Sequence, residues 1–318
     1  MDRYGYEPLA PGLIIDRQIK DVERVSNVLK RLLKRSGTKA KRVSTCVSAN
    51  NVISKVITVQ SDLDEDELQA MVEVEAEKAV PYDLEEVNID YARVGPSAQS
   101  PGEDAVQIVV CQKSIVEDLT EVIELAGLEA SVVDVDLFSL GNVHRYANQN
   151  RKGTKNNTSA LIDFGFNASR LMVFHNDVMV YQRDTSLGGR QLVDGIQRKY
   201  GTAVEDAIVA IKRNKLPQSY KKEVLKPYVK TLIQETIRSL QFFFSSATHS
   251  QIDRLVLTGG CAKIGNIDQI VQQRLEIPTS VLDPFQSARI GSKVDEARFH
   301  KDMPYLGLVS GLAMRGLS

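Results

Sequence analysis

Three glycine-containing turns carry the residue types that could hold a phosphate or a nucleotide. The first is the stretch "DFGFNAS", which places Asp163, Gly165, Asn167 and Ser169 in a turn between two apolar segments. Glycine lets backbone N–H groups come close to phosphate oxygens, and an Asp can hold Mg²⁺ through water. The pattern therefore favours a phosphate-binding hairpin, although D-x-G hairpins also occur as ordinary turns.

The other two turns follow later in the chain. Gly188 and Gly189 open a predicted helix, and the free N–H groups of a helix start favour an anion or a sugar hydroxyl. The stretch "LTGGC" ends a predicted strand, so Gly259, Gly260 and Cys261 could take a flat adenosine group. Each turn alone is also typical of ordinary structure, but the three in this order and spacing favour a nucleotide site.

Other kinds of chemistry find less support. The four histidines show no metal-ligand spacing, and neither G-x-x-x-x-G-K-[ST] nor G-x-S-x-G occurs. A basic region between 212 and 230 has few interleaved aromatics, which favours a solvated or protein-docking face over nucleic acid. Its members are Lys212, Arg213, Lys215, Lys221, Lys222, Lys226 and Lys230.

Length and composition limit the class of protein. The chain has 318 residues, enough for two domains, and its formal net charge of −1 favours neither nucleic acid nor an anionic membrane. Three scattered cysteines are typical of a reducing compartment. Because no apolar run approaches the roughly 18 residues of a membrane span and no signal sequence is present, we expect a chain that neither spans a membrane nor is secreted.

Two oppositely charged segments stand out in the first half. Residues 4–9 read as a short strand and 21–35 as an amphipathic helix, followed by strands at 42–49 and 52–59. The end of this helix and the loop after it are basic, most simply a solvated face; the cations are Lys30, Arg31, Lys34, Arg35, Lys39, Lys41 and Arg42.

The next segment is acidic and forms a predicted insert. Residues 61–86 carry eleven acidic residues against Lys78, and their helix is ended by Pro81. Strands at 87–94 and 105–112 follow, and then a helix that ends at Gly127 as a left-handed cap. An acidic insert beside a basic neighbour predicts a cleft that could hold a peptide carrying both charges.

The second half is built around the three glycine turns. A new strand is expected at 129–138 and a helix at 139–149, and the polar stretch 148–158 is the best interdomain linker. A long helix should run from Pro227 to about His249. At the C-terminus, Gly307 and Gly311 predict a helix that packs closely between two domains.

This order of hairpin, Gly-Gly helix, long helix, L-T-G-G turn and small-residue C-terminal helix resembles the actin/Hsp70/hexokinase ATPase superfamily. Within it, four segments resemble the PilM family of type IV pilus assembly proteins over about residues 4–317. They are "GGRQLVDGIQRKYG", "SLQFFFSSAT", "VPYDLEEVNIDY" and "ELAGLEASVVDVD". The resemblance implies an α/β, FtsA-like actin-like ATPase fold of two domains with an inserted 1C subdomain.

The resemblance also implies a division of the chain. The expected parts are subdomain 1A (1–51), the inserted subdomain 1C (52–127), the return to 1A with a linker (128–157), domain 2 with the hairpin and adenosine turn (158–300), and a C-terminal helix at the domain junction (301–318).

In that superfamily two D-x-G hairpins clamp the phosphates of ATP with Mg²⁺. The hairpin at Asp163 matches the second, with Asp163 as the Mg²⁺ partner through water. The first should precede residue 4, where two strands and a turn need roughly 20–30 residues. We therefore expect the fold to be N-terminally truncated, with a start further upstream as the alternative. Ile208 and Ile211 also stand where the family tends to carry a ribose-contacting Glu and Lys. Weak or no ATP binding and negligible hydrolysis are expected.

For function, the resemblance implies an adaptor. Such proteins bind the cytoplasmic N-terminal peptide of the inner-membrane protein PilN between subdomains 1A and 1C, and link it to pilus motor ATPases. The chain is then expected in the cytoplasm at the inner membrane, reaching the membrane only through partners and binding no nucleic acid. The alternatives are an FtsA-like division protein and a small-molecule kinase of the same superfamily.

Overall fold

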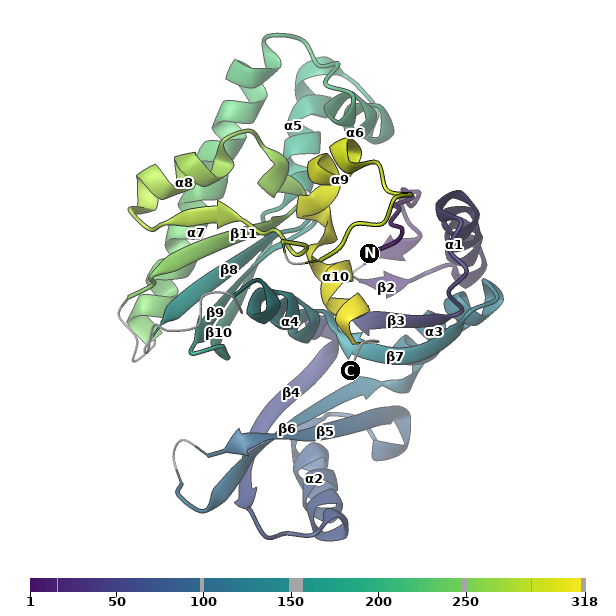
Figure 1. Cartoon of the computed structure of the whole chain (residues 1–318), viewed down its shortest axis with the longest axis vertical. Coiled ribbons are helices and arrows are strands. Elements are labelled where there is room, and N and C mark those ends of the chain that lie inside the picture. The colour runs from purple at the N-terminus through teal and green to yellow at the C-terminus, as the bar shows by residue number, and fades with distance from the viewer. Residues whose placement is uncertain (16, 98–99, 149–156, 247–250, 287, 316–318) are drawn as a thin grey trace. The chain divides into compact units, whose positions relative to one another are not determined.

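The protein divides into two compact units. A computed structural model describes residues 1–15, 17–97, 100–148, 157–246, 251–286 and 288–315. Unit 1 contains Met1–Ser139, Gly291–Val294 and Leu312–Ser318, and unit 2 contains Leu140–Ile290 and Asp295–Gly311. Strands and helices occur in both units, so the chain is an α/β protein as expected (Figure 1). Among the described residues, no helix combines the length and apolar character needed to cross a bilayer.

The first part of unit 1 is a parallel strand pair covered by two helices. Strand β3 (Arg42–Val47) pairs with β7 (Glu129–Val135), and helix α1 (Val22–Ser36) packs against α3 (Lys113–Leu125). The ends of α1 are fixed by its sequence. The Asp21 carboxylate accepts the Arg24 N–H at 2.9 Å, and Gly37 adopts the left-handed φ of 61° at the other end.

The insert of unit 1 is a three-stranded antiparallel sheet with one helix. Its strands β4 (Val52–Gln60), β5 (Val87–Pro96) and β6 (Glu103–Gln112) lie in the order β4–β6–β5. Helix α2 (Glu65–Ala79) covers one face of this sheet (Figure 1). Its buried side chains are Leu68, Val72 and Ala76, and a capping box of Asp64 and Glu67 starts it.

The predicted strand at residues 4–9 is wrong. The described residues before α1 contain only a short antiparallel pair, β1 (Ile14–Ile15) with β2 (Gln18–Ile19). Residues 3–7 lie along α1 through side chains instead. The Arg3 guanidinium donates to the Ser36 carbonyl at 2.6 Å, and Glu7 accepts from Arg35 at 2.5 Å. Without a neighbouring strand, alternating apolar residues have no ladder to join.

The boundary between β7 and the next helix also differs from expectation. The strand ends at Val135, and α4 (Asp136–Asn148) begins at Asp136 and not at Ser139. The buried Asp134 carboxylate accepts the Ser139 hydroxyl at 2.7 Å and the Arg315 guanidinium at 2.8 and 2.9 Å. This ion pair fixes Arg315, which follows α10 (Gly307–Met314), to the strand within unit 1.

Unit 2 is built on a five-stranded mixed sheet in the order β10–β9–β8–β11–β12. Its strands are β8 (Thr158–Phe164), β9 (Ser169–His175), β10 (Val178–Thr185), β11 (Arg254–Gly259) and β12 (Thr279–Val281). Strands β8, β11 and β12 run parallel, and β9 lies between β8 and β10 and is antiparallel to both. The apolar core of the unit surrounds this sheet and includes Phe164, Leu232, Phe243 and Leu257.

The helices of unit 2 are mostly those predicted. They are α5 (Gly189–Tyr200), α6 (Val204–Lys212), α7 (Lys226–Ser246), α8 (Ile267–Leu275) and α9 (Glu296–Asp302), with a π turn at Lys221–Leu225. Helix α10 begins in unit 2, and its residues from Leu312 on belong to unit 1. Short 3-10 turns lie at Ala49–Asn51, Leu84–Glu86, Gly260–Lys263 and Met303–Leu306. The predicted end of the long helix at His249 and most of the linker 148–158 lie outside the described residues.

Candidate functional site

Two parallel strands of unit 2 bring the first and third glycine turns to one edge of the sheet. Strands β8 and β11 are in register, so Asp163 pairs with Thr258 and Phe164 with Gly259. Gly259 has a φ of +85°, and a Cβ there would lie 2.5 Å from Oδ1 of Asp163. Because such a contact is too close for any side chain, only glycine fits where the adenosine-type turn meets the D-x-G hairpin.

The second turn joins the same cluster. A Cβ on Gly188 would lie 2.5 Å from the Phe166 carbonyl oxygen, and the Gly189 N–H donates to the Gly165 carbonyl at 2.9 Å. The Gly188 N–H donates to Oε1 of Gln191 at 2.9 Å. All three predicted turns therefore meet, but the two glycine amides expected to be free for an anion already have partners.

The other two predicted residues of the hairpin differ in their surroundings: one is buried and one is exposed. Ser169 is buried, and its hydroxyl donates to the Leu187 carbonyl at 2.6 Å. It therefore fixes the segment before α5 to strand β9. Asn167 is exposed at the turn. Its binding role, like that of Asp163 and the glycines, remains a prediction.

A buried thiol lies at the centre of the cluster. The Tyr228 hydroxyl is 3.1 Å from the Cys261 Sγ and donates to the Gly188 carbonyl at 3.0 Å. Burial raises the pKa of Cys261, although its hydrogen bond with Tyr228 acts in the opposite direction. Burial likewise raises the pKa of Tyr228. Both groups are therefore neutral at ordinary pH, and they hold the turns together without a charge.

An aromatic side chain beside the third turn was missed by the sequence reasoning. Tyr305 is 44% exposed, and its ring lies 3.0 Å from where a Cβ on Gly260 would be. The Lys263 amine lies 4.7 Å from the ring centroid and 3.3 Å from Asp302. An exposed ring beside a flat glycine turn can stack with a base. Little in the sequence indicated that Tyr305 would lie beside Gly260, because the two residues are far apart in the chain.

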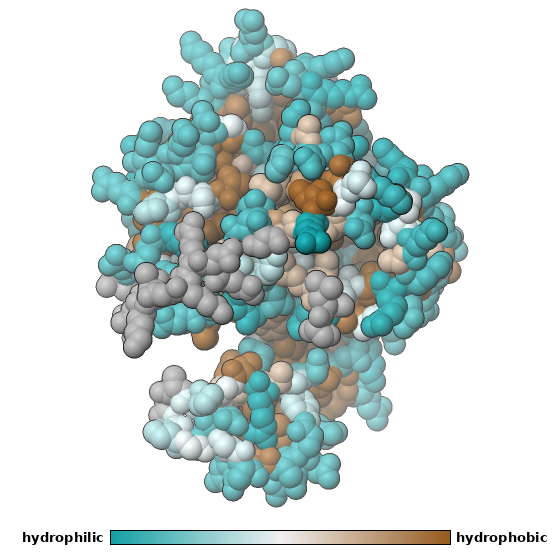
Figure 2. Space-filling model, viewed as in Figure 1, coloured by the Kyte–Doolittle hydropathy of each residue, from teal (hydrophilic) through white to brown (hydrophobic). Residues whose placement is uncertain are grey.

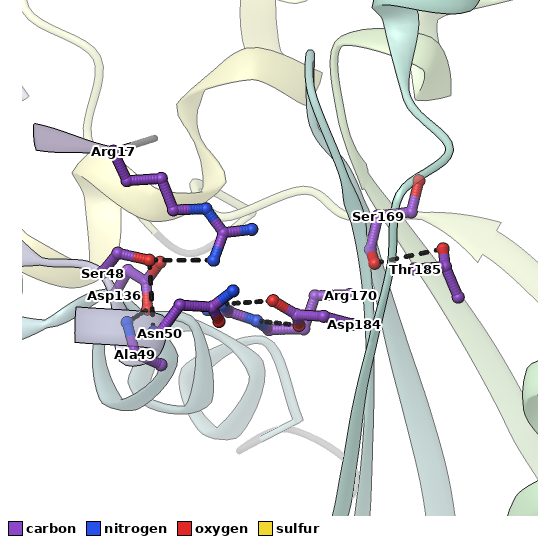
Figure 3. Close-up of polar contacts among 9 residues, drawn as sticks. All are labelled: Arg17, Ser48, Ala49, Asn50, Asp136, Ser169, Arg170, Asp184 and Thr185. Carbon is purple, nitrogen blue, oxygen red and sulfur yellow. Dashed lines mark hydrogen bonds and ion pairs between the residues drawn. The ribbon is translucent and has the colours of Figure 1, made fainter. Parts of the chain in front are cut away.

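The face of the sheet that carries Asp163 holds a buried ion pair. Arg170 is opposite Asp163 on one side and opposite Asp184 on the other. Its guanidinium forms a two-pronged pair with the Asp184 carboxylate at 2.6 and 3.0 Å (Figure 3). The cation closest in register to the hairpin aspartate therefore pairs with Asp184. Sequence reasoning also missed this pair.

Packing against the core explains why two positions on α6 are isoleucines. Ile208 and Ile211, where the family resemblance implies a Glu and a Lys, are partly buried against the apolar core of unit 2. They contribute to that core. Gly307 of α10 approaches the Thr258 hydroxyl of β11 so closely that a Cβ would not fit, and both residues belong to unit 2. The packing of this helix between two domains stays a prediction.

Unit 1 has a polar cluster at the matching edge of its own parallel strands. Asp136 follows β7, and its Oδ1 accepts the Ala49 N–H at 2.9 Å in the turn after β3. The Arg17 guanidinium donates to the Ser48 hydroxyl at 3.1 Å (Figure 3). This cluster was not predicted, although an Asp directly after a buried strand was a usable signal.

Whether a metal or a ligand fits beside these clusters depends on the side chains and the space available there. Within the described parts of the chain, no three His, Cys, Asp or Glu side chains converge as metal ligands would. A cavity of about 10 Å³ lies between α7 and the sheet of unit 2, lined by Ser169, Thr185, Glu235 and Thr236 among others. That volume is about enough for one water molecule.

The residues present thus fit the two parts of a nucleotide unequally. The glycine turn beside Tyr305 suits a flat adenosine group, whereas the amides at the start of α5 are occupied by the protein itself. A phosphate there would have to displace backbone hydrogen bonds.

Comparison with known proteins gives a consistent result. The family described as "Type IV pilus assembly protein PilM" matches residues 1–317. The solved structure "PilM-PilN type IV pilus biogenesis complex" is similar with a TM-score of 0.80 and 23% identity, over 98% of this chain and 90% of that chain. The ethanolamine utilization protein EutJ from Carboxydothermus hydrogenoformans is similar with a TM-score of 0.53 and 12% identity, over 95% and 77%.

Proposed function

The chain belongs to the PilM family of type IV pilus assembly proteins, and from this premise we propose that it acts as an adaptor and not as an ATP-driven motor. Its fold is that of the actin-like ATPase class. The family match over residues 1–317 favours this role over a cell-division protein or a small-molecule kinase.

We propose that the adaptor takes the cytoplasmic N-terminal peptide of an inner-membrane PilN protein, between the insert and the β3–β7 part of unit 1. One observation carries this proposal. Helix α2 covers one face of the insert sheet, since Lys55 of β4 pairs with Glu75 of α2 at 2.5 Å. The next residue, Val56, must lie on the opposite face and is 55% exposed. Figure 2 shows apolar surface interleaved with hydrophilic surface over the insert of unit 1.

Charge supports a peptide that carries cations. The insert carries an acidic helix, α2, with Glu65, Asp66 and Glu67 in its first turn. A peptide that presents apolar side chains to the open sheet and cations to the acidic edge of the insert would match this surface. In the cell, this binding would hold the protein at the cytoplasmic face of the inner membrane, where it would link PilN to the pilus motor ATPases.

The peptide proposal is tested by fluorescence anisotropy with a labelled synthetic PilN N-terminal peptide. Val56→Asp should weaken binding by about tenfold or more, because it places a charge on the apolar contact. Val178→Asp is the matched control, since Val178 is also a strand valine, 66% exposed, but in unit 2. Equal affinity for the two variants and the parent chain would contradict the proposal.

For the nucleotide we propose weak binding without meaningful hydrolysis. Two observations support it: the engaged amides at the start of α5, including Arg190 N–H to the Phe166 carbonyl at 2.8 Å, and the isoleucines on α6. If ATP binds, Asp163 would hold Mg²⁺ through water. Calorimetry with Mg-ATP should give a Kd near millimolar. A Kd in the low micromolar range would refute this part and leave the peptide proposal standing.

A further inference from the structure

Unit 1 separates its charges along the chain more sharply than the net charge suggests. Between residues 24 and 42 every charged side chain is basic, whereas residues 62–86 carry eleven acidic residues and one lysine. The cations of the first segment are Arg24, Lys30, Arg31, Lys34, Arg35, Lys39, Lys41 and Arg42. A chain of net charge −1 therefore presents a local field of strongly positive sign.

The basic residues form a row because of how α1 packs. Its apolar side packs against α3, and Ser26 and Val28 are buried. The exposed positions recur at helical spacing on the other side: Glu23, Arg24, Asn27, Lys30, Arg31, Lys34 and Arg35, so the row is basic after its first turn. Because the apolar side is already covered, this helix can offer only charges to a partner.

Three of these cations are not used by the fold. Arg31 and Arg35 pair with Glu7, Lys41 donates to the Gly127 carbonyl, and Arg42 donates to Ser131. The side chains of Lys30, Lys34 and Lys39 make no hydrogen bond or ion pair with any described residue. The acidic residues of α1 and of the elements that contact it are Glu7, Glu23 and, on α3, Glu117, Asp118, Glu121 and Glu124; within the described chain none is at ion-pair distance of these lysines.

The second basic region of the molecule is arranged differently. The cations between 212 and 230 are spread over the end of α6, the π turn and the start of α7. The side chains of Lys221, Lys222 and Lys226 are exposed and likewise make no hydrogen bond or ion pair with the described residues. They match the three lysines of unit 1 in number and chemistry, but belong to unit 2.

We propose that the exposed row of α1, with Lys39 after it, is a contact face for anionic phospholipid headgroups. The choice of a membrane over another acidic partner rests on the proposed function, because a peptide of a membrane protein bound to unit 1 would hold this unit near the bilayer. Each Lys or Arg near an anionic leaflet strengthens partitioning about fivefold. Binding is electrostatic, since no apolar side of α1 is left to insert.

Vesicle co-sedimentation of the full 318-residue chain tests the proposal, without any peptide present. Vesicles of phosphatidylglycerol with phosphatidylcholine should retain the chain at low salt, and vesicles of phosphatidylcholine alone should not. Retention should be lost at about 0.5 M salt, where screening is strong. The triple variant Lys30→Glu, Lys34→Glu, Lys39→Glu should partition at least about tenfold more weakly.

The matched control is Lys221→Glu, Lys222→Glu, Lys226→Glu, which should change partitioning by less than about twofold. Equal unfolding temperatures would show that both variants fold. The proposal is overturned if the parent chain ignores anionic vesicles, if both variants lose binding alike, or if the unit 1 variant loses only binding to polyglutamate or to a second copy of the chain.

The peptide assay keeps the two claims apart. The unit 1 lysine variant should bind the PilN peptide in solution within about twofold of the parent, because the peptide contact on the open sheet does not use these lysines. If the parent chain binds vesicles but not the peptide, the proposed function is contradicted and the lipid contact face is supported. If it binds the peptide but not vesicles, the lipid contact face is contradicted and the proposed function is supported.

Discussion

The two units use the same edge of a parallel strand pair in opposite ways. In unit 2 the edge is closed by glycines, and the N–H of Gly189 is consumed by the Gly165 carbonyl. In unit 1 the edge is built from side chains such as Arg17, Ser48 and Asp136. Unit 1 also leaves an open face of its insert sheet and a row of lysine side chains on and after α1 that are unpaired within the described chain, whereas the likewise unpaired side chains of Lys221, Lys222 and Lys226 in unit 2 lie on the π turn and the start of α7. The difference teaches that a glycine motif can mark a packing point, while docking capacity lies with exposed side chains.

The largest expected effect tests whether the glycine cluster is a packing point. Gly188→Ala should lower the free energy of unfolding by about 4 kcal/mol or more, because its Cβ would lie 2.5 Å from a backbone carbonyl that cannot move away alone. Gly265→Ala is the control, since no atom lies within 4 Å of its added Cβ. Chemical denaturation of the two variants is the measurement. Equal free energies of unfolding for the two variants would contradict the interpretation of the glycine cluster as a packing point.

The next largest effect is the loss of stability of unit 2 as the pH falls. His144 in unit 2 is fully buried, and its pKa is lowered from 6.5 to about 3, first by burial and then by the charges of Arg254 and Arg145. The unfolded chain binds this proton below pH 6.5 and the folded chain does not. Unit 2 should therefore lose about 3 kcal/mol between pH 6.5 and 4.

The His144 prediction is checked by following unfolding of unit 2 as a function of pH. His144→Gln should flatten the profile in that window, since glutamine keeps a hydrogen-bonding group opposite Ser159 but does not titrate. An unchanged slope in the variant would show that other groups cause the acid sensitivity.

A smaller effect concerns the ion pair of unit 1. Burial raises the pKa of Asp134, but hydrogen bonds from Arg315 and Ser139 outweigh it, so the net pKa is lowered. Because the carboxyl pKa is lower in the folded chain, the ion pair stabilises the fold at any pH above the ordinary Asp pKa of about 4. This contribution is lost as the pH falls from there through the pKa of the folded chain. Unit 1 should thus lose stability only below about pH 4, at lower pH than unit 2.

Replacing the cation of that pair gives the matching mutation. Arg315→Met should cost about 2 kcal/mol, discounted from a fully buried pair because the Arg315 side chain is 42% exposed. Arg238→Met, which removes an arginine 66% exposed and paired with Glu235, should cost less than about 0.5 kcal/mol. Thermal unfolding compares the two, and a larger loss for Arg238→Met would reverse the ranking.

Local signals predicted much of the fold. The Asp21 cap and Gly37 bound α1, the Asp64 capping box starts α2, and Gly127 has the left-handed φ of 77°. These features act over three or four residues, so the sequence contains all of the relevant atoms. The segment at 4–9 failed because strand formation depends on a partner that alternation of residue types does not reveal.

The site was predictable in composition but not in its hydrogen bonding. The sequence identified all three glycine turns, because a close approach needs glycine whatever the ligand. It did not reveal that the Gly189 amide would pair with the hairpin, nor that Tyr305 would lie beside Gly260. Both facts depend on contacts between residues far apart in sequence.

Hydrogen exchange of the 318-residue chain with and without the PilN peptide tests the central claim most directly. The account predicts slower exchange in β4 and β6 of the insert and no change at 158–169 or 254–261. Protection at the glycine cluster, with none in the insert sheet, would contradict it.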